Sequence, residues 1–253
     1  MREIKFFLSK DEMNNIYTSE YWNDIEKEKK KAWWIEDEDF TNCINFLNKE
    51  MLLSQYEIVE KKIKNFLERK EQCIIADVGA GIGWTSSLLS KLPQVAEIHA
   101  VEISRHRLEL HEKAFLMFDG NQEKHYRYIS SFYNMPFSDG MFDIVFMAQA
   151  FHHAENPDLL LYECKRILKK SGMIVFIGEH FVSKMSWLSV FLKNLRKKNI
   201  TFDTQVLFPP DNILGDHYYT RRFYKNIFRK NGFTLKTIPV GKELVGLASQ
   251  TNF

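Results

Sequence analysis

Asp77, Gly79, Gly81 and Gly83 stand in alternate positions within one short stretch of the sequence. An apolar run of the kind that forms a buried strand precedes them, and a segment of helical composition follows. Glycine permits a positive φ angle and lets a ligand approach the backbone closely. The first N–H groups of the following helix can also bind an anionic group. This stretch is therefore the first candidate for a ligand-binding loop.

Glu102 supplies a second group that suits the same ligand. It ends the next apolar run, about 20 residues after Gly83, where a carboxylate binds the hydroxyl groups of a ribose. The glycines do not have the G-x-G-x-x-G spacing of a dinucleotide site, and no lysine follows Gly83 as a phosphate-binding loop requires. The pattern favours a ribose-containing cofactor over both of these sites and over a turn without a ligand.

Four side chains capable of proton transfer follow two later apolar runs: His152, His153, Glu179 and His180. Histidine suits a general base because its ordinary pKa lies near neutrality. One of the adjacent histidines could instead only pack against, or cap, the next helix. No group of histidine, cysteine and carboxylate residues has the spacing of a metal site, so we expect no metal.

The surrounding pattern predicts the elements that must position these residues. Apolar runs alternate with amphipathic segments, which indicates a parallel sheet with helices on both faces and ligands at the carboxyl ends of its strands. Two final runs separated only by Gly-Lys are expected to form an antiparallel hairpin. Strands are predicted at 73–79, 97–104, 125–131, 141–149, 173–180, 234–240 and 243–250, and helices in 1–70 and at 83–92, 105–118, 156–172 and 220–233.

The composition is that of a globular protein with a large core. Of the 253 residues, 45% are hydrophobic and 27% are charged. No apolar run reaches the roughly 18 residues that a membrane span needs, and the first residues do not resemble a secretory signal. The three cysteines are far apart, as in a reduced cytoplasmic protein. We therefore expect a cytoplasmic chain without a transmembrane segment.

Four motifs in order carry a resemblance to a known family. They are DVGAGIG, AVEIS, NMPFSDGMFDIVFMAQAFHH and ECKRILKKSGMIVFIGEH, and they span roughly residues 70–180. This part of the chain resembles the class I S-adenosylmethionine-dependent methyltransferases, in particular the group called type 11. The resemblance implies a Rossmann-like, doubly wound α/β fold with a seven-stranded sheet, mostly parallel with an antiparallel last strand. It implies one domain over 1–253, made of a helical lid (1–70), a cofactor-binding core (71–180), a cap insertion (181–215) and a closing helix and hairpin (216–253).

The resemblance also implies roles for individual residues toward S-adenosylmethionine. Glu102 would bind both ribose hydroxyls, and Ile103 would lie against the adenine. Ser131 stands where the family has an aspartate for the adenine amino group, so binding there falls to the backbone of Ser131 and Phe132. Gln149 would lie near the methionine group. The residues expected to border the methionine half are Asp77, Gly79, Ala80, Gly81 and Gly83.

The acceptor side is less defined by sequence. We expect His153 to be the catalytic or positioning residue, ahead of His152 and His180. Several other residues could contact the acceptor, although aromatic residues in such positions are more often part of the packing. The candidates are Tyr17, Tyr21, Glu179, His217, Tyr218 and Arg221.

A basic segment late in the chain suggests an anionic partner. Residues 181–236 contain eleven lysines and arginines but three acidic residues, whereas the whole chain carries a net charge of only +2. A solvated helix face is the alternative. We expect a small acceptor, anionic, phosphorylated or sugar-linked, with O-methylation favoured. The alternatives are methylation of RNA or of a quinone-like lipid, and an inactive S-adenosylmethionine-binding protein; DNA is not expected.

Overall fold

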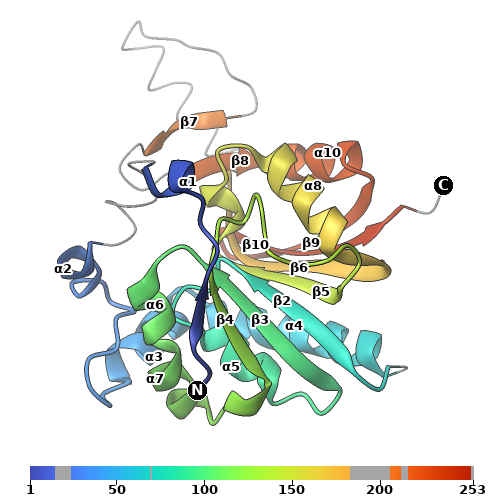
Figure 1. The fold of residues 1–253 in the computed structure, drawn as a ribbon. Helices are drawn as coiled ribbons and strands as arrows, with labels where there is room; N and C mark the ends of the chain where they lie inside the picture. Colours follow the sequence, from blue (N-terminus) through green and yellow to red (C-terminus); the bar gives the residue numbers. More distant parts are fainter. Residues whose placement is uncertain (15–23, 69, 183–205, 212–215, 252–253) are drawn as a thin grey trace, which may run out of the picture.

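The computed structural model describes residues 1–14, 24–68, 70–182, 206–211 and 216–251 of the chain (Figure 1). Within these residues the strands predicted from the sequence are present, and three further strands join them. The strands are β1 (Ile4–Phe6), β2 (Cys73–Val78), β3 (Val95–Glu102), β4 (His125–Ile129), β5 (Phe142–Ala148), β6 (Leu168–Val182), β7 (Val206–Asp211), β8 (Asp216–Thr220), β9 (Phe233–Val240) and β10 (Glu243–Gln250).

The strands of the described residues form one sheet in the order β1-β4-β3-β2-β5-β6-β10-β9. β4, β3, β2, β5 and β6 are parallel neighbours, whereas β10 runs antiparallel to both β6 and β9. The seven strands from β4 to β9 confirm the predicted doubly wound sheet with an antiparallel last strand. β7 and β8 lie off this path, where β8 pairs with the end of β6.

Helices cover both faces of the sheet (Figure 1). Successive side chains of a strand point to opposite faces, so each strand contributes to two cores. On β5, Ile144 and Phe146 pack with α3, α4 and α5, whereas Val145 and Met147 pack with α8 and α10. The helices are α1 (Lys10–Asn14), α2 (Ile25–Glu28), α3 (Thr41–Lys49), α4 (Leu52–Leu67), α5 (Trp84–Ser90), α6 (Arg105–Glu109), α7 (His111–Phe118), α8 (Pro157–Ile167) and α10 (Arg221–Lys230), with 3-10 turns η2 (Gln122–Lys124) and η3 (Phe151–His153).

Two predicted segments differ in the structure. Residues 1–70 were expected to be helical, but β1 adds a parallel strand beside β4, where Arg127 donates to the carbonyl of Arg2 at 2.6 Å. The helix expected over 156–172 ends at Ile167, because the carbonyl of Arg166 accepts from the Gly140 N–H at 2.8 Å and Leu168 pairs with β5. Both differences depend on contacts between segments far apart in sequence.

The carboxyl ends of β2, β3, β4, β5 and β6 meet at one edge of the sheet, because these strands are parallel neighbours in register. Each is followed there by a segment that the sequence analysis singled out. None of the helices in the described part of the chain has the length and apolar character that a membrane span requires.

Candidate active site

A cavity of about 630 Å³ opens at the carboxyl edge of the sheet. The segments that follow β2, β3, β4 and β5 line it together with the end of β6, and residues between α2 and α3 add a further wall. Its volume lies in the range typical of small-molecule sites. The predicted site residues that line it are Gly79, Ala80, Gly81, Glu102, Ile103, Ser131, Phe132, Gln149, His152, His153 and His180.

The remaining predicted residues lie elsewhere. Tyr17 and Tyr21 fall outside the described residues. Most of the cap predicted over 181–215, namely 183–205 and 212–215, also falls outside the described residues. The predicted residues that are described but do not line the cavity are Asp77, Gly83, Glu179, His217, Tyr218 and Arg221.

The glycines of the loop between β2 and α5 serve different purposes. A Cβ added to Gly81 would meet no atom within 4 Å, and Gly81 lines the cavity. A Cβ added to Gly83 would lie 2.5 Å from the Cγ atom of His111, below the loop. Both residues have a positive φ, of +54° and +82°. Gly81 therefore leaves space on the cavity side of the loop, and Gly83 is required by packing.

Asp77 lies beneath the loop and binds the first turn of α5. Its Oδ2 accepts from the hydroxyls of Thr85 and Ser86 at 2.7 and 2.6 Å. Its side chain is fully buried, and this burial raises the pKa of Asp77 to about 6, although the two hydroxyl bonds oppose the shift. Asp77 thus joins β2 to α5 and does not line the cavity beside the glycines.

Glu102 ends β3 with its carboxylate against the glycine loop. Oε2 accepts from the Gly81 N–H at 2.9 Å, and Oε1 accepts from the N–H groups of Ile103 and Ser104 at 2.7 and 3.0 Å. A carboxylate offers about four acceptor positions, so three are occupied by backbone. A ribose that bonds to this carboxylate through both hydroxyls would displace at least one of these backbone bonds.

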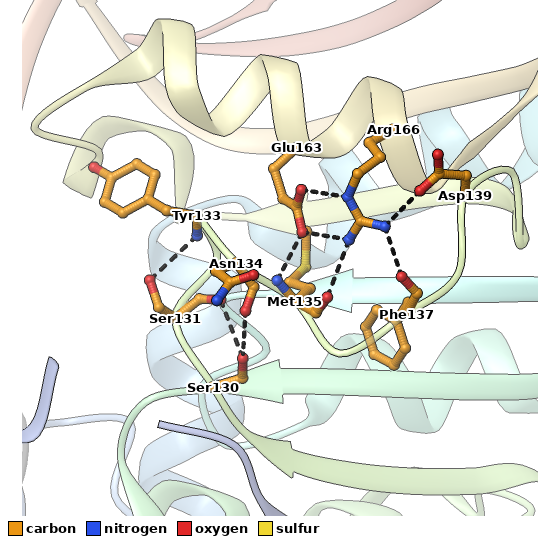
Figure 2. Close-up of polar contacts among 9 residues, drawn as sticks. All are labelled: Ser130, Ser131, Tyr133, Asn134, Met135, Phe137, Asp139, Glu163 and Arg166. Atoms are coloured by element: carbon orange, nitrogen blue, oxygen red, sulfur yellow. Dashed lines mark hydrogen bonds and ion pairs between the residues drawn. The ribbon is translucent and has the colours of Figure 1, made fainter. Parts of the chain in front are cut away.

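The loop after β4, which carries Ser131 and Phe132, is held by α8 (Figure 2). Glu163 accepts from the Met135 N–H at 2.7 Å. Arg166 donates to the carbonyls of Met135 and Phe137 at 3.0 and 2.6 Å and pairs with Glu163. The Ser131 hydroxyl accepts from the Tyr133 N–H at 3.2 Å, so it stabilises the turn itself. This network fixes the backbone next to the expected adenine position.

His152 and Glu179 form the most constrained polar pair of the cavity wall. The Nδ1 atom of His152 lies 2.9 Å from Oε2 of Glu179. The same carboxylate accepts from the N–H groups of Ala150, Phe151 and His152 at 2.9 to 3.0 Å. Burial acts to raise the pKa of Glu179, but its interactions with His152 and with the backbone N–H groups lower the pKa below its ordinary value. Glu179 is therefore an ionised, buried acceptor behind His152.

His153 and His180 lie beside this pair. The ring centroid of His152 is 4.3 Å from that of His153 and 5.0 Å from that of His180. The Nδ1 atom of His180 lies 3.8 Å from Oε1 of Glu243, whose pKa is raised chiefly by burial. The three imidazoles thus form a continuous group on one side of the cavity.

Residues from the last third of the chain lie next to this group of imidazoles. The ring of Tyr218 stacks on that of His180 with centroids 5.6 Å apart, and the ring of His217 contacts Tyr219 at 5.9 Å. Arg221 points to β9, where it donates to the hydroxyl and the carbonyl of Thr237 at 2.9 and 3.2 Å. Arg221 therefore joins α10 to β9 and does not reach the cavity.

Comparison with known proteins identifies this core. Residues 76–176 match the family model described as a methyltransferase domain. This part of the chain is a methyltransferase domain. The match covers the glycine loop, Glu102, the loop after β4 and His152, and it ends within β6.

Curated relatives match about two fifths of the chain. The demethylmenaquinone methyltransferase of Thermotoga maritima is 29% identical over 103 residues, which cover 41% of this chain and 42% of the relative. The malonyl-[acyl-carrier protein] O-methyltransferase of Legionella pneumophila is 29% identical over 102 residues, covering 40% and 34%. The chain therefore matches about two fifths or less of the length of these relatives.

A solved structure shows the same fold over more of the chain. The S-adenosylmethionine-dependent methyltransferase of Aquifex aeolicus aligns with a TM-score of 0.54 and 21% identity, covering 81% of this chain and 98% of that one. The name of that protein includes dependence on S-adenosylmethionine, and the likeness to it shows the fold. S-adenosylmethionine is also the cofactor that the sequence analysis expects. The described residues fit it, because the open space above Gly81 adjoins the Glu102 carboxylate within one cavity.

Sequence reasoning missed part of the wall of the methyltransferase domain. Glu28 of α2 accepts two hydrogen bonds from Arg107 of α6, at 2.6 and 2.8 Å, and the Arg107 guanidinium lies 5.0 Å from the Trp33 ring. Lys31, Trp33 and Phe46 also line the cavity. No local motif pairs Glu28 with Arg107, because about 80 residues separate them. Only an alignment of related sequences would have carried that signal.

Proposed function

We propose that this chain is an S-adenosylmethionine-dependent methyltransferase that methylates a hydroxyl oxygen of a small acceptor, with His152 as general base. The observation that carries the proposal is the hydrogen bond between His152 Nδ1 and Glu179 at the cavity wall. An ionised carboxylate only accepts, so Nδ1 of His152 bears the proton in this pair. In the neutral ring, Nε2 then carries the lone pair that a base requires.

The transfer would be a displacement in which an acceptor oxygen forms a bond to the methyl carbon while the bond from that carbon to the sulfonium sulfur breaks. S-adenosylhomocysteine would leave with the electron pair of that bond. S-adenosylmethionine supplies a methyl group that its sulfonium already activates. His152 takes the hydroxyl proton at Nε2 while Nδ1–H stays bonded to Glu179, which stabilises the resulting imidazolium. The protein otherwise contributes alignment, which is the main requirement for a donor of this reactivity.

The residues that would hold the cofactor follow from the cavity. The Glu102 carboxylate would bind the ribose, and Ile103 and Phe132 would flank the adenine. Gln149, which follows β5 with a φ of +52°, and the open face of Gly81 would border the methionine half. This arrangement leaves the three imidazoles for the acceptor.

The acceptor class is proposed from the cavity and from the sequence. The two relatives are named for different acceptors, so the likeness to them does not choose one. The sequence favoured an anionic, phosphorylated or sugar-linked molecule. Arg221 bonds to Thr237 and does not line the cavity, so it would not contact such an acceptor. Lys31 and Arg107 line the cavity and could contact an acidic group of the acceptor. A small acceptor agrees with a cavity of 630 Å³ that also holds the cofactor.

Binding of S-adenosylmethionine, measured by calorimetry, tests the cofactor assignment. Wild-type protein should bind it, and Glu102→Ala should bind it at least tenfold more weakly, because the ribose loses its carboxylate (about 1.4 kcal/mol per tenfold). Absence of binding by wild-type protein at millimolar cofactor would overturn the whole proposal. Unchanged affinity of Glu102→Ala would show that the ribose lies elsewhere.

Transfer of labelled methyl tests the reaction. The protein is incubated with methyl-labelled S-adenosylmethionine and separate small-molecule, lipid and RNA fractions of a cell extract, and the labelled product is identified by mass spectrometry. We expect an O-methylated small molecule, and a loss of about 100-fold or more in His152→Ala with cofactor affinity unchanged. The matched variant His153→Ala should lose less. Label in RNA, or a larger loss in His153→Ala, would contradict the proposal.

A further inference from the structure

Two fully buried histidines lie behind the glycine loop. The Nε2 atom of His111, on α7, is 3.0 Å from the carbonyl oxygen of Gly81. The Nδ1 atom of the same ring is 2.8 Å from Nε2 of His125, the first residue of β4. Both side chains have no exposed surface. These contacts connect the first residue of β4 to the glycine loop, through side chains that do not themselves line the cavity.

The chemistry of the partners determines the direction of both hydrogen bonds. A carbonyl oxygen only accepts, so Nε2 of His111 bears a proton. A neutral imidazole has one N–H, so Nδ1 of His111 accepts from Nε2–H of His125. Burial lowers the pKa of His111 to about 3, despite its bond to Gly81, and burial together with nearby cationic groups lowers the pKa of His125 well below its ordinary value. Both rings therefore stay neutral, with one defined tautomer each.

The packing around His111 fixes its ring as tightly as its hydrogen bonds do. A Cβ on Gly83 would lie 2.5 to 2.7 Å from three ring atoms of His111. The ring of His125 stacks on that of His111 with centroids 5.0 Å apart. The His111 ring thus lies directly against the backbone of the loop, and a side chain at position 83 would push the two apart.

The peptide groups of Gly81 are held from two sides, and one of these two contacts is among the backbone bonds with which a ribose would compete. Its N–H donates to Glu102, and its carbonyl accepts from His111. Three of the four acceptor positions of Glu102 are occupied by backbone, so a bond to both ribose hydroxyls displaces at least one backbone bond. The bond from His111 does not compete with the ribose and can persist.

We propose that His111 is a positioning residue for the cofactor loop, which keeps the Gly81 backbone in its binding conformation while Glu102 turns to the ribose. His125 acts through His111. Its Nε2–H donates to Nδ1 of His111, which favours the His111 tautomer that donates from Nε2 to the Gly81 carbonyl. The inference rests on the proposed binding of S-adenosylmethionine, and it makes no use of the acceptor or of the general base.

Calorimetric binding of S-adenosylmethionine and S-adenosylhomocysteine tests it in three variants. His111→Leu removes the donor and should weaken both affinities about tenfold, whereas His111→Gln retains an N–H donor and should stay within about threefold of wild type. The matched control is His99→Leu, a buried histidine that contacts Tyr128 and Glu97 instead of the loop. It should lose thermal stability but keep wild-type affinity, measured on the folded fraction.

The outcomes separate this inference from the proposed function. If wild-type protein binds neither ligand, the proposed function fails. If wild-type protein binds and folded His111→Leu binds equally well, or loses no more affinity than His99→Leu, the positioning role is wrong. Nitrogen-15 NMR of wild-type protein gives a test that needs no variant: we expect Nε2–H tautomers for both His111 and His125 from pH 8 to pH 5. An Nδ1–H tautomer of His111 would overturn the inference.

Discussion

Alanine substitutions at Gly81 and Gly83 should separate cofactor binding from folding within one loop. Both residues have φ angles in the left-handed region, but their surroundings differ. A methyl group at position 81 would enter open space in the cavity, where the proposed cofactor would approach the backbone. A methyl group at position 83 would overlap the ring of His111. We therefore expect Gly81→Ala to impair binding and Gly83→Ala to impair stability.

The expected losses of unfolding free energy follow from two costs, that of an alanine in the left-handed conformation and that of overpacking. The left-handed conformation costs an alanine roughly 1–2 kcal/mol, and this should be the whole loss of unfolding free energy in Gly81→Ala. Gly83→Ala adds the cost of overpacking, roughly 1–3 kcal/mol, which gives a loss of about 2–5 kcal/mol. In a domain of this size the additional loss lowers Tm by about 2–4 °C per kcal/mol. Gly81→Ala should in addition bind S-adenosylmethionine at least tenfold more weakly (about 1.4 kcal/mol).

Thermal unfolding without ligand and calorimetry with S-adenosylmethionine measure the two effects. Gly140→Ala is the matched control, because Gly140 has a φ of +63°, meets no atom within 4 Å of an added Cβ and does not line the cavity. It should be as stable as Gly81→Ala and bind like wild type. The reasoning is refuted if Gly81→Ala binds like Gly140→Ala, or if Gly83→Ala is as stable as either.

Three further predictions concern the groups around the cavity. The pKa of Glu179 in the folded protein lies below its ordinary value of 4.5. Ionised Glu179 therefore stabilises the folded state above pH 4.5, and this stabilisation is lost as the pH falls through the lowered pKa of the folded state. Urea unfolding of Glu179→Gln should therefore depend less on pH between 5 and 3 than that of wild type; an equal slope would contradict the assigned ionisation. Arg166→Ala leaves the carbonyls of Met135 and Phe137 without their charged donor. Chemical unfolding should show a loss of about 1–3 kcal/mol in the free energy of unfolding, and calorimetry should show weaker binding of S-adenosylmethionine. Glu28→Ala leaves the largely buried Arg107 without its carboxylate and should lower the free energy of unfolding by about 3 kcal/mol. Glu109→Ala removes one partner of an exposed ion pair and should lower it by less than about 1 kcal/mol. Equal losses in the two variants would contradict this prediction.

The fold and the cofactor side were predictable because their signals are local. A strand of parallel type, a glycine loop and a helix follow one another within 20 residues of Cys73, and Glu102 ends the next strand. Strand alternation and helical periodicity depend only on neighbours in the chain. The register of the parallel strands then brings their carboxyl ends together whatever the surrounding side chains are.

The features that the sequence did not show depend on contacts over long sequence distances. β1 forms because β4 offers an edge, and Arg221 turns to Thr237 because β9 lies next to it. The sequence placed Glu179 among the substrate-binding residues, but the structure buries it behind His152 with four donors around one carboxylate. The side-chain direction at a strand end is set by what packs against it, which no local pattern records.

The sequence by itself therefore indicated the α/β class and the glycine loop, and its resemblance to a known family implied the seven-stranded sheet and the methyl donor. The tertiary structure decided which histidine is held by a carboxylate, which glycine faces the cavity and which faces His111, and that Asp77 belongs to the interior. The difference has one physical cause. Backbone conformation follows from residue types over a few positions, whereas burial and hydrogen-bond partners exist only after distant segments have packed together.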